Sequence, residues 1–193
     1  VCIHAQRIIV HHEIYDEFID SFVEKASQLK AGSPLDPETD ISAMIDEANA
    51  VRVEEWIREA VDSGAELKLG GARKGNYVEP TVLTRTAPDM KVCSLEVFGP
   101  VVTIEKYDEF KSAIEYINFG RYGLQAGIFT NAIEEMNIAF GQLDVGGVII
   151  NDVPTFRVDH MPYGGVKDSG LGREGVRYAI HDMMEPKILV KNK

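Results

Sequence analysis

Apolar residues recur every three or four positions in two stretches of the first third of the chain. This spacing places them on one face of a helix and predicts helices over about 13–30 and 45–63. A glycine and two prolines interrupt the pattern between the stretches, and Gly64 follows the second one. The two helices are therefore expected to be separate elements joined by an irregular connection.

Short runs that are rich in β-branched and apolar residues predict strands. They lie at 7–10, 66–69, 77–83, 101–107, 124–130 and 147–151. Asp108 is expected to cap a helix after the fourth run, and Asn131, with Glu134 in a capping box, a helix after the fifth. A short helix is expected around 173–183, and 186–191 is expected to be an exposed strand.

Strands and helices alternate through the second half of the chain. This alternation is typical of an α/β fold, and it predicts three layers, α/β/α, with a mainly parallel sheet between helices. The length of 193 residues fits one domain that can bury a core without disulfide bonds.

Composition narrows the classes of partner. The net charge of −11 argues against binding to nucleic acid or to an anionic membrane. No apolar stretch is long enough to span a bilayer, and the first residues do not resemble a signal peptide. The two cysteines are too few for a disulfide framework, which favours a reducing compartment and a cytoplasmic location.

Cys2 and the five histidines are the first candidates for chemistry. A cysteine before a strand is commonly a core residue, whereas a reactive thiol needs a neighbouring cation or helix N-terminus. A Cys/His pair would need a base at the thiol, and the sequence does not choose among the histidines. The spacing of His4, His11 and His12 matches no metal-ligand pattern, so no metal site is expected.

Residues 170–175 satisfy the pattern G-x-G-x-x-G, but the context of a dinucleotide site is missing. Such a site follows a strand and opens a helix in a βαβ unit, with an acidic residue about twenty positions later. Here the preceding residues do not read as a strand. The glycines are instead expected to allow tight turns.

The stretch Glu96-Val97-Phe98-Gly99-Pro100 suits the nicotinamide end of a cofactor. A carboxylate can accept hydrogen bonds from two ribose hydroxyls, and an aromatic ring can pack on a nicotinamide. Taken alone, a glutamate before an aromatic residue is usually just a solvated acid beside a packing residue.

Three stretches together resemble the aldehyde dehydrogenase superfamily. They are the Val1–Arg7 run, which resembles the family's Gly-Gln-x-Cys motif without its Gly-Gln, the Glu96–Pro100 run, and the Met161–Gly175 run. The resemblance covers nearly the whole chain in order and implies the catalytic-domain fold of that family.

The resemblance implies that Cys2 is the nucleophile of an NAD- or NADP-dependent oxidation of an aldehyde to a carboxylic acid. It further implies that Glu96 binds the nicotinamide ribose, that Phe98 packs by the ring, and that Arg52 stands where many members place a lysine near that ribose. Tyr163 corresponds to an aromatic residue of the substrate tunnel, with simple packing as the alternative.

The resemblance also implies what the 193 residues do not contain. The family's general-base glutamate, its oxyanion-binding asparagine and its Rossmann domain, which binds most of the cofactor, match nothing here. Residues 1–183 correspond to the catalytic domain and 184–193 to an oligomerisation arm. The isolated chain is therefore expected to be inactive, and the full-length protein to be a homodimer or homotetramer.

The segment from Asn151 to His160 resembles members that act on lactaldehyde or glyceraldehyde phosphates. Arg157 or His160 is expected to contact a polar or anionic substrate tail; the alternative is that both are solvated loop residues. Two further alternatives remain for the chain, a non-catalytic module of the same fold and a relative that acylates coenzyme A. Cys93 is expected to be structural.

Overall fold

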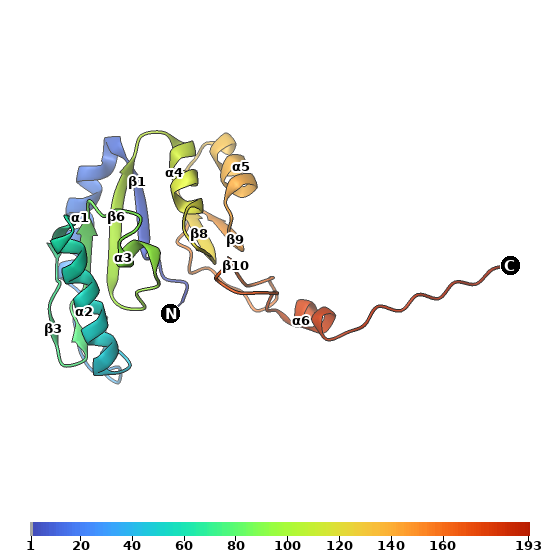
Figure 1. Cartoon of the computed structure of the whole chain (residues 1–193), viewed down its shortest axis with the longest axis horizontal. Coiled ribbons are helices and arrows are strands. Elements are labelled where there is room, and N and C mark those ends of the chain that lie inside the picture. Colours follow the sequence, from blue (N-terminus) through green and yellow to red (C-terminus); the bar gives the residue numbers. More distant parts are fainter. Residues whose placement is uncertain (1) are drawn as a thin grey trace. The chain divides into compact units, whose positions relative to one another are not determined.

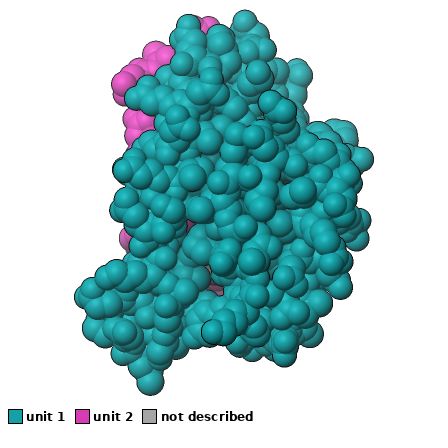
Figure 2. Space-filling model, turned by 90° about the vertical axis from the view of Figure 1, so that its left-hand side faces the viewer, with its two compact units in different colours: residues 1–120 teal, residues 121–193 magenta. Residues whose placement is uncertain are grey.

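The computed structural model describes residues 2–193, which form two compact units, unit 1 up to Gly120 and unit 2 over Arg121–Lys193 (Figure 2). Unit 1 holds the expected nucleophile and the Glu96 segment. Unit 2 holds the glycine-rich segment and the expected substrate-binding residues. Each unit has its own sheet pairing and is described separately.

Unit 1 is built on a four-stranded sheet in the order β1-β6-β5-β2. Figure 1 shows β1 and β6 side by side. The strands are β1 (Arg7–His11), β6 (Val101–Tyr107), β5 (Thr81–Thr84) and β2 (Glu66–Leu69). The first three are parallel to one another, and β2 joins β5 antiparallel. The expected mainly parallel sheet is therefore confirmed in this unit.

Helices cover both faces of that sheet. On one face, α1 (Tyr15–Ser27) follows a short 3-10 turn, η1 (His12–Ile14), and buries Ile19 with Val82 and Ile104 of the sheet. On the other face, α2 (Glu47–Asp62) and α3 (Lys91–Ser94) pack on Leu83 and Val101. Neighbouring strand residues thus point to opposite cores, which gives unit 1 the expected three layers.

Further short elements complete unit 1. They are the hairpin of β3 (Arg73–Lys74) and β4 (Tyr77–Val78), and the helix α4 (Phe110–Asn118), which packs against β6. Pro80 separates β4 from β5, as its missing N–H group predicts.

Unit 2 contains two parallel strands, β8 (Gln125–Ile128) and β9 (Gly147–Ile150), joined through α5 (Ile133–Gln142). A second, antiparallel pair consists of β7 (Tyr122–Gly123) and β10 (Val166–Lys167). The last helix is α6 (Val176–Asp182). The βαβ arrangement predicted for the second half is therefore present, in shortened form.

Both expected helix caps are wrong. Helix α4 begins after Glu109, and the Asp108 carboxylate lies 3.3 Å from the His12 ring nitrogen instead. Helix α5 begins after Ala132, one residue beyond Asn131, and the Thr130 hydroxyl accepts a hydrogen bond from the Ala132 N–H at 3.1 Å. Only the residue directly before the first helical turn can cap a helix. A helix that begins one residue later than predicted is therefore not capped by the predicted residue.

The expected strand over 186–191 is also wrong. After α6 the chain continues without regular structure (Figure 1). Ile188, Leu189 and Val190 in this segment are exposed. A strand needs a hydrogen-bonded neighbour, and none of the described residues pairs with this segment. Within residues 2–193 there is no helix with the length and apolar character that crossing a bilayer requires.

Candidate active site

Cys2 lies in the turn that leads into β1, and its side chain is exposed. Two residues later, burial lowers the pKa of His4, and the nearby Glu96 carboxylate partly opposes this effect. The segment that carries Cys2 lies beside the segment that carries Glu96, because Gln6 is hydrogen-bonded to Leu95 and Val97 on either side of Glu96. An exposed thiol at this place is accessible to a substrate, as a nucleophile must be.

Gln6 connects these two segments directly. Its side-chain amide donates hydrogen bonds to the carbonyl oxygens of Val92 at 2.9 Å and Leu95 at 2.8 Å. Its amide oxygen accepts a hydrogen bond from the Val97 N–H at 2.9 Å. The Gln6 backbone carbonyl accepts from Thr103 at 2.9 Å and so starts the pairing of β1 with β6.

Val97 is the fixed point of the Glu96–Phe98 turn. Its side chain is completely buried in the core that α2 and α3 cover, whereas Glu96 and Phe98 on either side are exposed. Phe98 has a φ of +51°, a left-handed conformation that costs an aromatic residue about 1–3 kcal/mol. The buried Val97 side chain and the hydrogen bond from the Val97 N–H to Gln6 hold this strained turn in place.

Arg52 approaches the same turn from α2. Its guanidinium donates to the Val97 carbonyl oxygen at 2.8 Å and lies 4.5 Å from the centre of the Trp56 ring. Unit 1 therefore brings Arg52, Glu96 and Phe98 into one neighbourhood, next to the segment of Cys2. The arrangement agrees in position with the expected cofactor-binding residues, whose roles stay predictions.

In unit 2, two of the three expected substrate-binding residues are in contact. The Arg157 guanidinium lies 4.4 Å from the centre of the buried Tyr163 ring and forms an ion pair with Glu174 at 2.9 Å. Backbone hydrogen bonds between Tyr163 and Glu174 close this cluster. His160 is exposed nearby in the chain. The contact from Glu174 is one that the sequence did not indicate.

Cys93 occupies a structural position. It is buried, and its thiol donates to the Thr86 hydroxyl at 3.0 Å. Burial raises the pKa of Cys93, which disfavours the thiolate. These properties are opposite to those of a nucleophile and agree with the structural role expected for it.

Glu105 on β6 belongs to the same polar cluster. Its carboxylate accepts hydrogen bonds from the Thr86 N–H at 2.6 Å and the Thr86 hydroxyl at 2.7 Å. Burial raises the pKa of Glu105 above its usual range, and hydrogen bonds from Thr86 and the charge of Arg7 only partly oppose this. A group with a raised folded-state pKa stabilises the fold at low pH, and this contribution is lost as pH rises through that pKa.

The Glu105→Gln variant should therefore gain stability relative to the wild type as pH rises. Glutamine keeps an acceptor for the Thr86 N–H but has no charge to bury. Melting temperatures measured from about pH 4 to about pH 8 should give a difference, variant minus wild type, that grows with pH. A difference that is constant or shrinks over this range would contradict the buried-carboxylate account.

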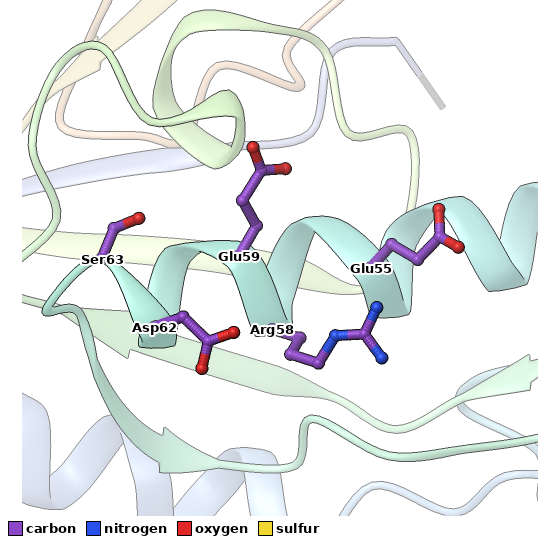
Figure 3. Close-up of a pocket in the computed structure, with 5 residues that line it drawn as sticks. All are labelled: Glu55, Arg58, Glu59, Asp62 and Ser63. Carbon is purple, nitrogen blue, oxygen red and sulfur yellow. The ribbon is translucent and has the colours of Figure 1, made fainter.

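A shallow hollow of about 390 Å³ lies along α2 (Figure 3). Glu55, Arg58, Glu59, Asp62 and Ser63 line it, and none of them is an expected site residue. Lys91 forms an ion pair with Glu59 at 2.7 Å, so part of the negative charge of the hollow is neutralised. Within residues 2–193, no group of three or more His, Cys, Asp or Glu side chains is arranged to hold a metal ion.

Comparison with known sequences places these features in a family. The model of the aldehyde dehydrogenase family matches residues 1–189. The chain is 52% identical over 192 residues to 3-sulfolactaldehyde dehydrogenase of Priestia aryabhattai, covering 100% of this chain and 40% of the relative. It is 42% identical over 192 residues to lactaldehyde dehydrogenase of Methanococcus aeolicus, covering 100% of this chain and 41% of the relative.

Solved structures give the same result. Aldehyde dehydrogenase 21 from Physcomitrella patens, in complex with the reaction product succinate, superposes with a TM-score of 0.96 at 47% identity. The match covers 99% of this chain and 40% of that one. For glyceraldehyde-3-phosphate dehydrogenase from Methanocaldococcus jannaschii, complexed with NADP, the TM-score is 0.91 at 44% identity, over 95% of this chain and 40% of that one.

The chain thus spans about 40% of the length of the curated relatives and solved structures that it matches. Within that part, the match runs from the Cys2 segment through the Glu96–Phe98 turn to the glycine-rich segment. The chain therefore belongs to the aldehyde dehydrogenase family.

Proposed function

We propose that the protein carrying this chain oxidises a short polar or anionic aldehyde to the carboxylic acid with NAD or NADP, and that Cys2 is its nucleophile. The observation that carries the proposal is the placement of the exposed Cys2 segment beside the anchored Glu96–Phe98 turn. This placement supports a thiol working next to the reactive end of a dinucleotide.

The proposed reaction has two stages at Cys2. The Cys2 thiolate attacks the aldehyde carbon, a C–S bond forms, and the carbonyl π electrons move to the oxygen. The oxygen lone pair then re-forms the C=O bond as a hydride leaves the carbon, and bound NAD or NADP would supply the acceptor for this hydride. The resulting acyl thioester on Cys2 is hydrolysed by water, which releases the acid and regenerates the thiolate. Covalent catalysis of this kind divides one difficult step into two easier ones.

The residues of unit 1 fit the nicotinamide end of such a cofactor. The Glu96 carboxylate is exposed and can accept hydrogen bonds from ribose hydroxyls, while the exposed Phe98 ring offers an apolar face. Arg52 adds a positive charge beside them. We assign the ribose to Glu96, the ring contact to Phe98, and the border of the ribose site to Arg52.

The names of the relatives support the substrate class. They include enzymes for 3-sulfolactaldehyde, lactaldehyde and glyceraldehyde 3-phosphate, which are all short aldehydes with a hydroxyl or anionic group. Arg157 is the proposed contact for that group, with His160 beside it in sequence and Tyr163 as the packing surface. The Tyr163 ring and Glu174 fix the guanidinium plane, and Arg157 has five N–H donors, more than its ion pair uses.

Arg157→Ala should lower kcat/KM about 10- to 100-fold for an aldehyde with a sulfonate or phosphate group, because a hydrogen bond to a charged group contributes about 1.5–3 kcal/mol. Propanal, which lacks such a group, should be oxidised at nearly the wild-type rate. Steady-state kinetics on both aldehydes measure the difference. Arg177→Ala, which removes an exposed arginine of α6, is the matched control. Equal losses on both aldehydes would contradict direct contact with the anionic group.

The function itself is tested by incubating the full-length protein with these aldehydes and NAD or NADP. Reduced cofactor and free acid should appear in equal amounts, and an intact-mass measurement of quenched protein should find the acyl group on Cys2. Formation of an acyl-coenzyme A product instead, on addition of coenzyme A, would favour the acylating relative. Failure to oxidise any aldehyde would favour the non-catalytic module.

We also propose that the full-length protein is a homodimer or homotetramer in the cytoplasm, without nucleic acid or membrane partners. The exposed apolar residues after α6 support association through this segment, and the low number of cysteines supports a reducing compartment.

A further inference from the structure

One side chain, Gln6, joins the segment of the proposed nucleophile to the turn of the proposed cofactor site. Its three hydrogen bonds reach Val92, Leu95 and Val97, between 86 and 91 positions away in the sequence. Both N–H donors of the amide are used, and its oxygen accepts one hydrogen bond. A primary amide on a side chain of this length is the group that supplies two donors and one acceptor together.

The middle residue of the turn, Val97, is held by its backbone and by its side chain. The Val97 N–H is taken by Gln6, its carbonyl oxygen by Arg52, and its side chain is completely buried. The two hydrogen bonds and the buried side chain restrain the position of Val97. They thereby also restrain the backbone of the exposed residues on either side of it. Phe98 keeps its left-handed backbone conformation within this frame. Strain of this kind persists where the surroundings over-determine the backbone.

From this arrangement we infer that Gln6 is a positioning residue: it fixes the Glu96–Phe98 turn relative to Cys2 and thereby sets the geometry of hydride transfer. The inference rests on the proposed function. The three hydrogen bonds of the Gln6 side chain all go to backbone groups next to the turn, so its action on the reaction would pass through Glu96 and Phe98. The Gln6 backbone carbonyl accepts the hydrogen bond from Thr103 next to the β1–β6 pairing, so the side chain ties the turn to the central strands of unit 1.

The Gln6→Met variant tests this role because methionine matches the length of glutamine but makes no comparable hydrogen bonds. In the full-length enzyme, we expect kcat to fall about 10- to 100-fold and the KM for NAD or NADP to rise, since a displacement of about 1 Å can cost 10²-fold in rate. An aldehyde deuterated at its reactive carbon should show a primary isotope effect on kcat that is larger in the variant than in the wild type. A residue that only stabilised the fold would not change which step limits the rate.

Two further measurements separate positioning from the nucleophile and from folding. Alkylation of Cys2 by iodoacetamide, which needs no cofactor, should stay within about threefold of the wild type, a difference below 1 kcal/mol in activation free energy. Gln6→Glu keeps the acceptor for Val97 but places a carboxylate against two carbonyl oxygens, and it should be impaired at least as strongly as Gln6→Met. Gln28→Glu, at the exposed end of α1, introduces the same charge away from this region and should behave as the wild type.

Unchanged kcat, cofactor KM and isotope effect in folded Gln6→Met and Gln6→Glu would overturn the inference while leaving the proposed function intact. If Gln6→Met does not fold, as its melting curve would reveal, Gln6→Glu and Gln6→Asn carry the same comparison, and unfolding of all three would show a purely structural role and overturn it. A wild type that oxidises no aldehyde would be the distinct failure of the proposed function, and the positioning role would fall with it.

Discussion

Cys2→Ser is expected to lower kcat for aldehyde oxidation by at least about 10³-fold, because a serine hydroxyl at its ordinary pKa is a poor nucleophile and the covalent step is lost. Cys2 is exposed, so the substitution should change the free energy of unfolding by less than about 0.5 kcal/mol. The acyl adduct seen by intact mass on the wild type should be absent from the variant.

The second cysteine provides the matched control. Cys93→Ser changes the same atom in a buried place where the thiol donates to Thr86. It should cost about 1 kcal/mol of stability, because a more polar group is buried, and leave kcat within a few-fold of the wild type. Cys2→Ser with the activity of Cys93→Ser would contradict the assignment of the nucleophile.

The strands and helices of unit 1 were predictable because their signals are local. The strand predicted over 101–107 is β6 to the residue, and that over 66–69 is β2. Apolar spacing likewise predicted α1 and α2 to within three residues at either end. The helix caps at Asp108 and Asn131 were wrong because a cap depends on the first residue of the helix, which periodicity does not determine.

The strand over 186–191 was wrong for a different reason. Its β-branched residues favour an extended backbone, but pairing requires a neighbour that the described part of the chain does not offer. Strand formation is a property of two segments, so the composition of one segment could predict an extended backbone and nothing more.

The residues of the candidate site also fall into those that the sequence predicted and those that only the structure revealed. Cys2, Glu96 and Phe98 were nominated from short motifs, and the structure adds that Gln6 and Arg52 hold the backbone between the last two. No sequence pattern predicted these hydrogen bonds, because a polar side chain that bonds to backbone groups 45 or 91 positions away leaves no periodic trace. Gln6 does lie in the Cys2 motif, four residues after the thiol, and this position was the one available signal.

A second long-range constraint lies at Gly146 in unit 2, where two backbone segments meet. The Gly146 N–H donates to the carbonyl oxygens of Gly123 and Leu124 at 3.1 and 3.0 Å. A Cβ atom at this position would lie 2.8 Å from the carbonyl carbon of Gly164, in the glycine-rich segment, and would overlap the attached oxygen. Backbone atoms cannot rotate away as a flexible side chain can, so the segments would have to separate.

Gly146→Ala should therefore destabilise unit 2 by roughly 3 kcal/mol, the upper part of the usual range for overpacking. Gly141→Ala is the matched control, because its Cβ would meet nothing within 4 Å and lies near the end of α5, where alanine should gain about 0.5 kcal/mol. The single tryptophan, Trp56, belongs to unit 1 and would not report on unit 2 by itself. Urea unfolding followed by circular dichroism, with hydrogen exchange of peptides from 121–193, should therefore measure the loss. Equal protection of these peptides in the two variants would mean that the close approach of Gly146 and Gly164 does not hold unit 2 together.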